Sequence, residues 1–177
     1  MTIAHDRQSD AAVGAKNDAR DAAHGDVQTV ALFRIVPASK ADRAFCEANG
    51  DKAGRWSSAS TPVIYASLSA ACALLEFLAH LKGAPEESLR LVEARMPARA
   101  LRKVGVLPDD WSQHPYRPHV QAIGDEWVRA GTSLALRVPS ALSPRECNAL
   151  INAAHADLRL IETVGHEHIR LDPRLHE

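Results

Sequence analysis

Two arginines, a tyrosine and a glutamate in the first half of the chain stand against apolar sequence, where such side chains are uncommon. Arg34 lies within the run VQTVALFRIV, Arg55 lies in a Gly-Arg-Trp triplet, and Tyr65 follows a short apolar run. Glu76 is the one formal charge in residues 56–79. An arginine binds phosphate through its fork of donors, a tyrosine ring stacks on a flat ring, and a carboxylate can stabilise positive charge that develops on a ribose. Together these residue types suit an anionic ligand that carries a sugar.

Each of these side chains also has an ordinary structural interpretation. An arginine in apolar sequence can form a structural salt bridge or extend its charged end to water. Glu76 can be a solvated surface acid, because a helical wheel places it opposite the apolar face, with Cys72 and Ala73 beside it. These small neighbours also leave room for a ligand, so the wheel leaves a surface acid and a cleft acid both open.

Polar residues further along the chain admit the same two interpretations. Ser140 follows Pro139 at the end of an expected strand, where it could donate a hydrogen bond to the ligand or serve as a turn residue. Asn152 and His155 can likewise be ligand-binding or structural. The His-Glu-His triplet at residues 166–168 is a weak metal pattern, because i, i+2 histidines near a carboxyl terminus are typical of a surface. We assign no metal.

Local signals predict the elements that position the first group of residues. Residues 27–36 and 63–66 are expected to be buried strands, because both runs are apolar. Either Ser67 or Ser69 can cap the helix that follows and runs to about residue 81. That helix has one broad apolar face, which consists of Ala71, Leu74, Leu75, Leu78 and Leu81.

Caps, prolines and alternation predict the remaining elements. A capping box at Ser39 predicts a short helix over residues 40–48, and the Ser-Pro-Arg-Glu sequence at residues 143–146 predicts another helix start. Pro118 predicts a helix over residues 118–130, with Gly131 as its stop. Further strands are expected at residues 89–96, 133–138, 158–164 and 169–171, and a loop is expected over 104–115. Strands and helices that mix without regular alternation favour a single domain of the α+β class.

Composition limits the class of protein further. The chain has 177 residues, 46% of them hydrophobic and 24% charged, and a formal net charge of -1, which disfavours binding to nucleic acid or to a membrane. Residues 1–26 have almost no large apolar side chains and are expected to be a disordered tail before a domain at 27–177. Three scattered cysteines favour a reducing cytoplasm, and no apolar run has the length of a signal peptide or a membrane span. The common phosphate-loop, dinucleotide, zinc-protease and hydrolase motifs are absent.

Several short blocks, in order along the chain, resemble RES-domain proteins, the toxins of RES/Xre toxin–antitoxin pairs. The blocks cover about residues 32–175 and are Phe33-Arg34, Gly54-Arg55-Trp56, Pro62-Val63-Ile64-Tyr65-Ala66-Ser67, Leu75-Glu76, Gly124-Asp125-x-Trp127, Val138-Pro139-Ser140, Asn152-x-x-His155 and Asp172-Pro173-Arg174-Leu175. Two positions depart from the family pattern. Ser57 stands where Asn often follows Gly-Arg-Trp, and Ala153 stands where the family has proline after Asn152. Neither departure removes a candidate catalytic group, but the roles of Asn152 and His155 stay open.

The resemblance implies a single α+β domain similar to ADP-ribosyltransferases, with mixed or antiparallel sheets and flanking helices, and an enzyme that consumes NAD. Glu76, with Arg34, would be catalytic, and its carboxylate would stabilise an oxocarbenium-like transition state as nicotinamide departs. Arg34 and Arg55 would hold the pyrophosphate or the ribose. Tyr65 would contact the nicotinamide, and Ser140 would contact a polar edge of it. No cofactor is expected beyond NAD as the substrate.

The resemblance also implies a cytoplasmic toxin that arrests growth by depleting NAD and is silenced by a cognate Xre-type helix-turn-helix antitoxin. The acceptor stays open, because water, phosphate and a protein side chain can attack the same anomeric carbon. A protein ADP-ribosyltransferase with a specific target is therefore an alternative, and so is a non-catalytic module that binds NAD or the antitoxin. A toxin that cleaves nucleic acid is disfavoured, because the sequence has no basic stripe. The oligomeric state, including a homo-oligomer, also stays open.

Overall fold

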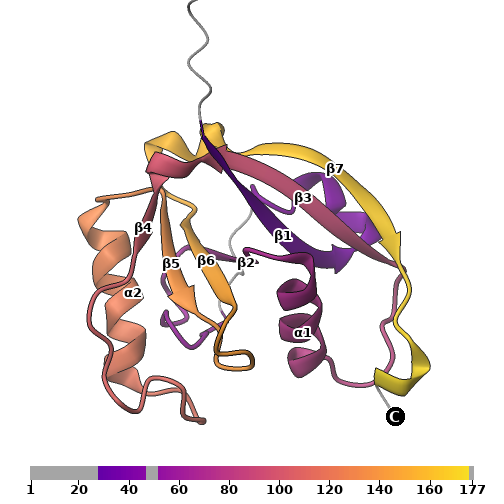
Figure 1. Ribbon diagram of the computed structural model, residues 1–177, viewed down its shortest axis with the longest axis horizontal. Helices are drawn as coiled ribbons and strands as arrows, with labels where there is room; N and C mark the ends of the chain where they lie inside the picture. The colour runs from indigo at the N-terminus through magenta and orange to yellow at the C-terminus, as the bar shows by residue number, and fades with distance from the viewer. Residues whose placement is uncertain (1–27, 47–51, 176–177) are drawn as a thin grey trace, which may run out of the picture.

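The computed structural model describes residues 28–46 and 52–175, and these residues form one seven-stranded sheet with helices around it (Figure 1). The strands are β1 (Thr29–Pro37), β2 (Val63–Ser67), β3 (Leu89–Pro97), β4 (Leu101–Lys103), β5 (Ala135–Pro139), β6 (Cys147–Asn152) and β7 (Glu162–Ile169). Their order across the sheet is β4-β5-β6-β2-β1-β3-β7. Neighbouring strands are antiparallel except β4 and β5, which are parallel. The predicted α+β class is confirmed, and the predicted tail at residues 1–26 lies outside the described residues.

The sheet divides into two halves that are barely joined. β1 pairs with β3 along its whole length, and β2 pairs with β6 along its whole length, but β1 and β2 share only the Phe33–Ser67 pair. In Figure 1 the strands β1, β3 and β7 therefore cross the view at a steep angle to β4, β5 and β6. The helix that follows β2 contacts both β1 and β2, so it lies at the junction of the two halves.

Two α-helices flank the sheet, and both have clear local causes. The helix α1 (Ala70–His80) begins where the Ser69 side chain accepts the Cys72 N–H at 3.1 Å, so the cap is Ser69 rather than Ser67. The helix α2 (Pro118–Ala130) ends at Gly131, which has φ 56° and accepts the left-handed conformation without a side-chain penalty. Four short 3₁₀ helices complete the described elements: η1 (Ala38–Arg43), η2 (Ala98–Ala100), η3 (Ala156–Leu160) and η4 (Pro173–Leu175).

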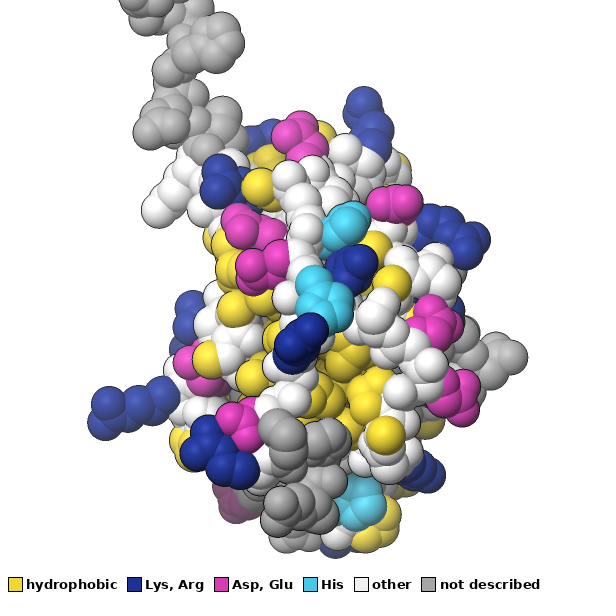
Figure 2. Space-filling model, turned by 90° about the vertical axis from the view of Figure 1, so that its right-hand side faces the viewer, with side chains coloured by type: hydrophobic (Ala, Val, Ile, Leu, Met, Phe, Trp, Pro, Cys, Tyr) yellow, Lys and Arg dark blue, Asp and Glu magenta, His cyan; other side chains and the backbone are white. Residues whose placement is uncertain are grey.

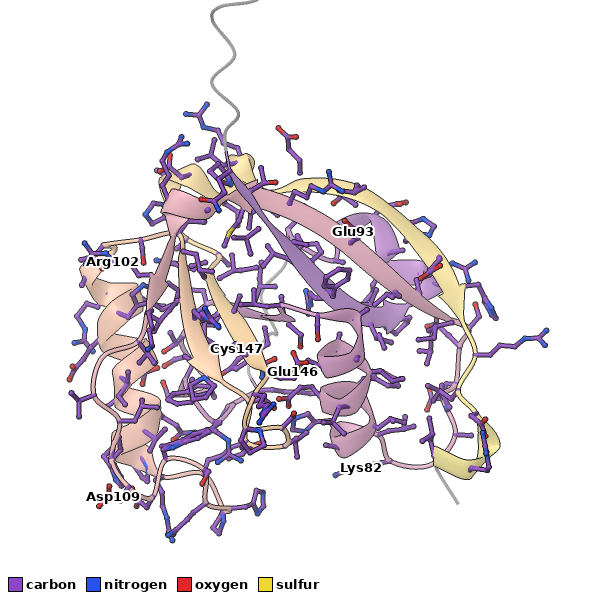
Figure 3. All side chains as sticks on the ribbon, viewed as in Figure 1. Lys82, Glu93, Arg102, Asp109, Glu146 and Cys147 are labelled. Carbon is purple, nitrogen blue, oxygen red and sulfur yellow. The ribbon has the colours of Figure 1, made fainter. Side chains whose placement is uncertain are left out.

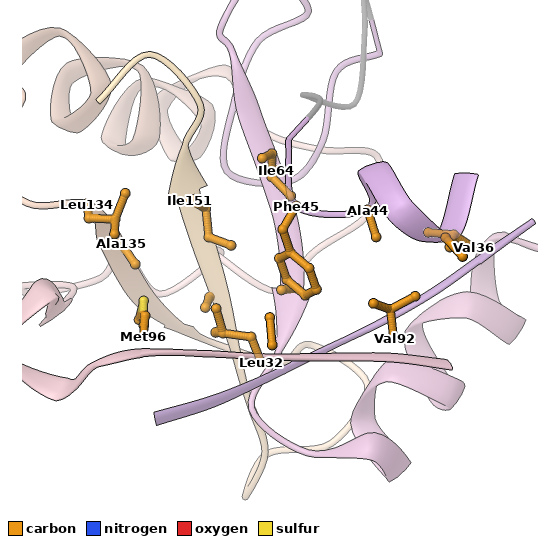
Figure 4. Packing of buried hydrophobic residues seen from close by; sticks show 14 residues of the cluster. Leu32, Val36, Ala44, Phe45, Ile64, Val92, Met96, Leu134, Ala135 and Ile151 are labelled. Atoms are coloured by element: carbon orange, nitrogen blue, oxygen red, sulfur yellow. The ribbon is translucent and has the colours of Figure 1, made fainter. Parts of the chain in front are cut away.

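Side chains alternate between the two faces of the central strands, and each face packs into its own hydrophobic core. Ile64 and Ala66 of β2 enter a core with Leu32, Phe45 and Val92, which Figure 4 shows from close by. The strand residues between them face the other way, toward a second core beneath α2 that consists of Trp56, Val63, Val104, Val120, Trp127, Leu136, Val138 and Leu150. Each fully buried large side chain contributes about 1.5–3 kcal/mol. The two faces of β2 are therefore both buried, which fixes its register.

The largest difference from the sequence prediction is at β6. The capping sequence at residues 143–146 predicts a helix, but residues 147–152 form a strand between β2 and β5. Ala149, Leu150 and Ile151 are each fully buried. A central strand with both faces covered buries three consecutive apolar side chains, whereas a helix with one covered face would expose some of them. Pairing with two strands distant in sequence overrides the local helix signal. The strand β4 was not predicted either.

Two other predicted elements differ in kind or in length. The helix expected over residues 40–48 is the 3₁₀ helix η1, and residues 47–51 lie outside the described residues. The two strands expected around Gly165 are one strand, β7, preceded by η3, with a register shift opposite Glu93 and Ala94. A bulge lets one strand keep pairing through the irregular position, so no turn is needed there.

Charge is distributed without a dominant sign on the face that Figure 2 shows, where acidic and basic side chains are interspersed around a central apolar area. This agrees with the formal net charge of -1. Among the described residues, we find no helix with the length and apolar character that a membrane crossing requires.

Close backbone packing joins α2 to the segment before β2. Gly124 lies so close to the backbone of Trp56 that a Cβ at this position would be 1.9 Å from the Trp56 carbonyl oxygen. The neighbouring Asp125 Oδ1 accepts the Ser58 N–H at 2.9 Å and the Thr61 hydroxyl at 2.5 Å. Asp125 therefore fixes the turn that leads into β2.

The Asp125 carboxylate also makes stability depend on pH. Its partial burial alone would raise its pKa, but the hydrogen bonds from Thr61 and Ser58 outweigh burial and hold the pKa below its ordinary value. Because the folded pKa lies below the unfolded pKa of about 3.9, the stabilisation is present above that pH and is lost as pH falls through the folded pKa.

We expect Asp125→Ala to lower the free energy of unfolding by about 1–3 kcal/mol at pH 7, because two donors lose their acceptor. The difference from wild type should shrink as pH falls toward 3. Urea unfolding followed by tryptophan fluorescence measures both effects, and exposed Asp109→Ala is the control, with an expected change of about 0.5 kcal/mol or less. If the difference in unfolding free energy between Asp125→Ala and wild type were the same at pH 3 as at pH 7, the ionised Asp125 carboxylate would not be the source of the stabilisation.

Candidate active site

Glu76 is not on a solvated outer face of α1 but meets the ends of β5 and β6. Its Oε1 accepts a hydrogen bond from the Ser140 hydroxyl at 2.8 Å and another from Asn148 Nδ2 at 2.6 Å. The helix turns Cys72 and Ala73 inward, where both are buried, while Leu75 is 39% exposed. The apolar face of the wheel is therefore not the buried face. The structure brings Glu76 and Ser140 together, as the sequence led us to expect.

Ser140 is fixed as a donor toward Glu76. Its Oγ accepts the N–H groups of Leu142 and Ser143 at 3.2 and 3.3 Å, so the hydroxyl proton is free to point at the carboxylate. The same loop is tied to α1, because Glu146 accepts a hydrogen bond from the capping Ser69 at 2.8 Å. Figure 3 labels Glu146 and Cys147, where the connection from β5 to β6 lies beside α1. The loop and the helix thus hold the two sides of one site.

Asn148 is the residue that sequence reasoning missed. It lies on β6 opposite Ser67 of β2, and its Oδ1 accepts the Ser67 hydroxyl at 2.7 Å and the Cys72 thiol at 3.5 Å. Burial is the main cause that raises the pKa of the Cys72 thiol, which keeps the thiol protonated. The only available signal was the Asn in the run CNALIN, and a predicted helix there concealed its pairing with Ser67.

Tyr65 anchors the Gly-Arg-Trp segment. Its hydroxyl lies 2.8 Å from the Ser57 hydroxyl and accepts the Trp56 N–H at 3.3 Å. Burial raises the pKa of Tyr65 to about 12, so the phenol is neutral at physiological pH. Tyr65 and Ser67 are two residues apart on β2 and therefore share a face of the sheet. The tyrosine and the Glu76 cluster are thus on the same side of β2.

Arg55 holds the loop before α2. Its Nη1 donates to the carbonyl oxygens of Trp111 and Gln113 at 3.1 and 2.7 Å, and its guanidinium lies 5.0 Å from the centroid of the Tyr116 ring. These contacts fix the loop that the sequence predicts over residues 104–115. Within the described residues, Arg55 is not a hydrogen-bond partner of Glu76.

Arg34 lies on the face of β1 that carries Leu32 and Val36, and its Nη1 donates to the carbonyl oxygen of Ala44. Burial lowers the pKa of Arg34 to about 10, which still leaves the guanidinium charged at pH 7. Phe33, next to it, pairs with Ser67 and so shares the opposite face. Arg34 therefore lies on the other face of the sheet from Ser67, which supports the Glu76 cluster through Asn148.

Asn152 and His155 have structural partners. Asn152 Nδ2 donates to the Val128 carbonyl at 3.4 Å, and its Oδ1 accepts the Ala154 N–H at 3.0 Å. His155 Nδ1 accepts the Asp157 N–H at 3.1 Å and caps η3. These contacts give both residues a structural role in the turn that follows β6.

The arrangement around Glu76 suits a reaction in which positive charge develops next to a carboxylate. One oxygen is held by two donors, and among the described residues Oε2 accepts no hydrogen bond, which leaves it available to a ligand. A carboxylate fixed in this way can accept a hydroxyl hydrogen bond or stabilise a sugar cation without reorganising at the moment of reaction.

Comparison with known proteins gives the family. A family model described as RES domain matches residues 31–172, a range that contains Arg34, Arg55, Tyr65, Glu76 and Ser140. The chain belongs to the RES-domain family. Its match with the Prs ADP-ribosylating toxin of Sphingobium sp. (strain YBL2) is 33% identical over 128 residues, 69% of this chain and 80% of that protein. Its match with Toxin Res of Photorhabdus laumondii is 30% identical over 151 residues, 81% of this chain and 96% of that protein.

A solved structure shares the fold of this RES-domain protein. The M. tuberculosis MbcT-MbcA toxin–antitoxin complex contains a chain that matches with a TM-score of 0.60 at 15% identity. The match covers 80% of this chain and 85% of that chain. This chain and that chain of the complex therefore share a fold although their sequences are only 15% identical.

Proposed function

We propose that this RES-domain protein is the toxin of a toxin–antitoxin pair and that it consumes NAD by cleaving the nicotinamide–ribose bond. The observation that carries the proposal is the Glu76 carboxylate, held through Oε1 by Ser140 and Asn148 with Oε2 available. Membership of the RES family and the name of the Sphingobium relative support the same chemistry. The loss of NAD would arrest growth.

In this reaction the bond between the ribose anomeric carbon and the nicotinamide nitrogen breaks. Its electron pair goes to the nitrogen, so the nicotinamide leaves as a neutral ring and the ribose carries the positive charge. Glu76 stabilises this cation and orients the ribose hydroxyls, while Ser140 and Asn148 hold the carboxylate in place. Water then gives ADP-ribose and a proton, and phosphate gives ADP-ribose phosphate.

Arg34 and Arg55 are proposed to bind the pyrophosphate or ribose, and Tyr65 is proposed to contact the nicotinamide. A guanidinium presents five N–H donors in a fork that matches a phosphate, and among the described residues Arg55 uses only Nη1, toward the carbonyl oxygens of Trp111 and Gln113. No cofactor other than the substrate NAD enters this proposal.

We expect Arg34→Ala and Arg55→Ala to raise KM for NAD about 10–100-fold while kcat changes much less, because each removes charged hydrogen bonds to the bound substrate. Steady-state kinetics over a range of NAD concentrations measures the split. The control is Arg102→Ala, an exposed residue of β4. A fall in melting temperature with an unchanged KM would assign both arginines to purely structural roles.

A protein ADP-ribosyltransferase is the second candidate, and the name of the Sphingobium relative favours it. The two candidates differ only in the acceptor. Purified protein incubated with NAD, with and without phosphate, should yield free ADP-ribose or its phosphate, which mass spectrometry separates. If free products are scarce and cell-extract proteins acquire label from NAD labelled in its adenosine, the second candidate replaces the first.

The proposed partner is a cognate antitoxin of the Xre helix-turn-helix type, and the proposed location is the cytoplasm. One structural neighbour, the M. tuberculosis MbcT-MbcA pair, is a toxin–antitoxin complex. Cys46, Cys72 and Cys147 are free cysteines, which fits a reducing compartment. The face in Figure 2 has no basic patch, so this face offers no support for nucleic-acid binding.

A further inference from the structure

We propose that Asn148 is a positioning residue that orients the Glu76 carboxylate for catalysis. This inference rests on the proposed function, because it gives Asn148 a part in the same reaction. Asn148 donates from Nδ2 to Glu76 Oε1 at 2.6 Å, the shorter of the two hydrogen bonds on that oxygen. It lies outside the residue set that the sequence and the family resemblance pointed to.

The amide of Asn148 can face Glu76 in only one way. Its Oδ1 accepts hydrogen bonds from the Ser67 hydroxyl at 2.7 Å and from the Cys72 thiol at 3.5 Å. Turning the amide over would place Oδ1, an acceptor, against a carboxylate oxygen, which also accepts, whereas the Ser67 hydroxyl can accept as well as donate. The carboxylate therefore selects the end of the amide that faces it, and the Ser67 hydroxyl holds the other end.

The support comes from buried residues on a strand that is paired on both sides. Asn148 is 9% exposed and Ser67 is 3% exposed, and they are directly opposite each other on β6 and β2. β6 is also paired on its other side, where Asn148 lies opposite Val138 of β5. A side chain on a strand paired on both sides positions a group more sharply than one on a loop, and Ser140 lies just beyond the end of β5.

This geometry has a chemical consequence at the carboxylate. The terminal torsion of a glutamate is broad when the carboxylate is free. Two hydrogen bonds from different directions on Oε1 remove that freedom, and they thereby fix where Oε2 lies. Because small displacements of a reacting group cost large factors in rate, loss of the Asn148 bond should act on kcat more than on KM.

The test compares Asn148→Asp and Asn148→Ala with wild type. Both should lower kcat about 10–100-fold with KM changed by about threefold or less. Asn148→Asp should also move the acid limb of the pH–rate profile to higher pH, because two adjacent carboxylates share a proton. Asn152→Asp is the matched control: it is a buried Asn on the same strand, held by Val128 and Ala154. It should lower the melting temperature without moving the acid limb.

A second measurement does not depend on these variants folding. In a nitrogen-resolved NMR spectrum of wild type, one side-chain amide proton of Asn148 should lie downfield and should move upfield by several tenths of a ppm or more in Glu76→Gln. An unmoved amide signal, or Asn148 variants with wild-type kcat and pH profile, would overturn the inference while wild-type NAD turnover leaves the proposed function standing. A wild type that does not turn over NAD would overturn both.

Discussion

Glu76→Gln is expected to lower kcat for NAD consumption about 10²–10³-fold and to leave KM within about threefold of wild type. Glutamine keeps the size of the side chain, and its amide oxygen can still accept from Ser140 and Asn148. It lacks the negative charge that stabilises the ribose cation, so the loss falls on the chemical step. Initial rates of NAD loss over a range of concentrations give both constants.

Glu126→Gln is the matched control for this substitution, because Glu126 is exposed on α2. Its rate should equal that of wild type. If Glu76→Gln abolishes growth arrest but still binds the antitoxin, the alternative of a non-catalytic binding module is excluded. Full NAD consumption by a folded Glu76→Gln protein would remove the carboxylate from the mechanism.

Gly124→Ala is expected to destabilise the fold by about 3 kcal/mol or more. In an ordinary exposed helix the same change stabilises by about 1 kcal/mol, because alanine has the higher helix propensity. Here the added Cβ would be 1.9 Å from the Trp56 carbonyl oxygen and 3.0 Å from its carbonyl carbon, so α2 or the backbone of Trp56 must move. The sign of the effect is therefore opposite to the one that propensity predicts.

Chemical unfolding at pH 7 measures this change, and Gly105→Ala is its control. A Cβ at Gly105 would meet no atom within 4 Å, so that variant should stay within about 0.5 kcal/mol of wild type. Movement of Trp56 would also disturb Tyr65, which accepts its N–H, so the folded fraction of Gly124→Ala should bind NAD less well. Equal stabilities of the two alanine variants would contradict the packing described here.

Elements whose ends are marked by a local cap, proline or glycine could be predicted from the sequence. Pro118 and Gly131 bound α2 as expected, and Ser69 caps α1. The apolar run before Tyr65 lies in β2, and the family resemblance grouped Glu76 and Ser140 around one ligand, although it did not predict the hydrogen bond between them. In each case a few adjacent residues, or a motif, carry the information.

What could not be predicted depends on contacts between distant segments. The residues just before β6 form a good helix start. Residues 147–152 nevertheless form a strand, because β2 and β5 pair with both of its edges. Asn148 reaches Glu76 only once that strand is in place. For the same reason the broad apolar face of α1 is not its buried face: the sheet presents polar partners to Glu76, while Leu75 is exposed.

The roles of the two arginines show a further limit of local sequence. Arg34 and Arg55 stand out in apolar sequence, but their partners are the carbonyl oxygens of Ala44, Trp111 and Gln113, which are 10 to 58 residues away along the chain. A backbone carbonyl carries no side-chain signal in the sequence. Their proposed contact with phosphate therefore stays a prediction that kinetics must test.

The most direct test of the central claim is to follow NAD by proton NMR in the presence of the purified protein, freed of antitoxin. We predict that signals of free nicotinamide appear at the rate at which those of NAD disappear, and that Glu76→Gln shows neither change on the same time scale. NAD that stays intact with a folded wild type, or that breaks at the pyrophosphate to give two mononucleotides, would contradict the claim that Glu76 directs cleavage of the nicotinamide–ribose bond.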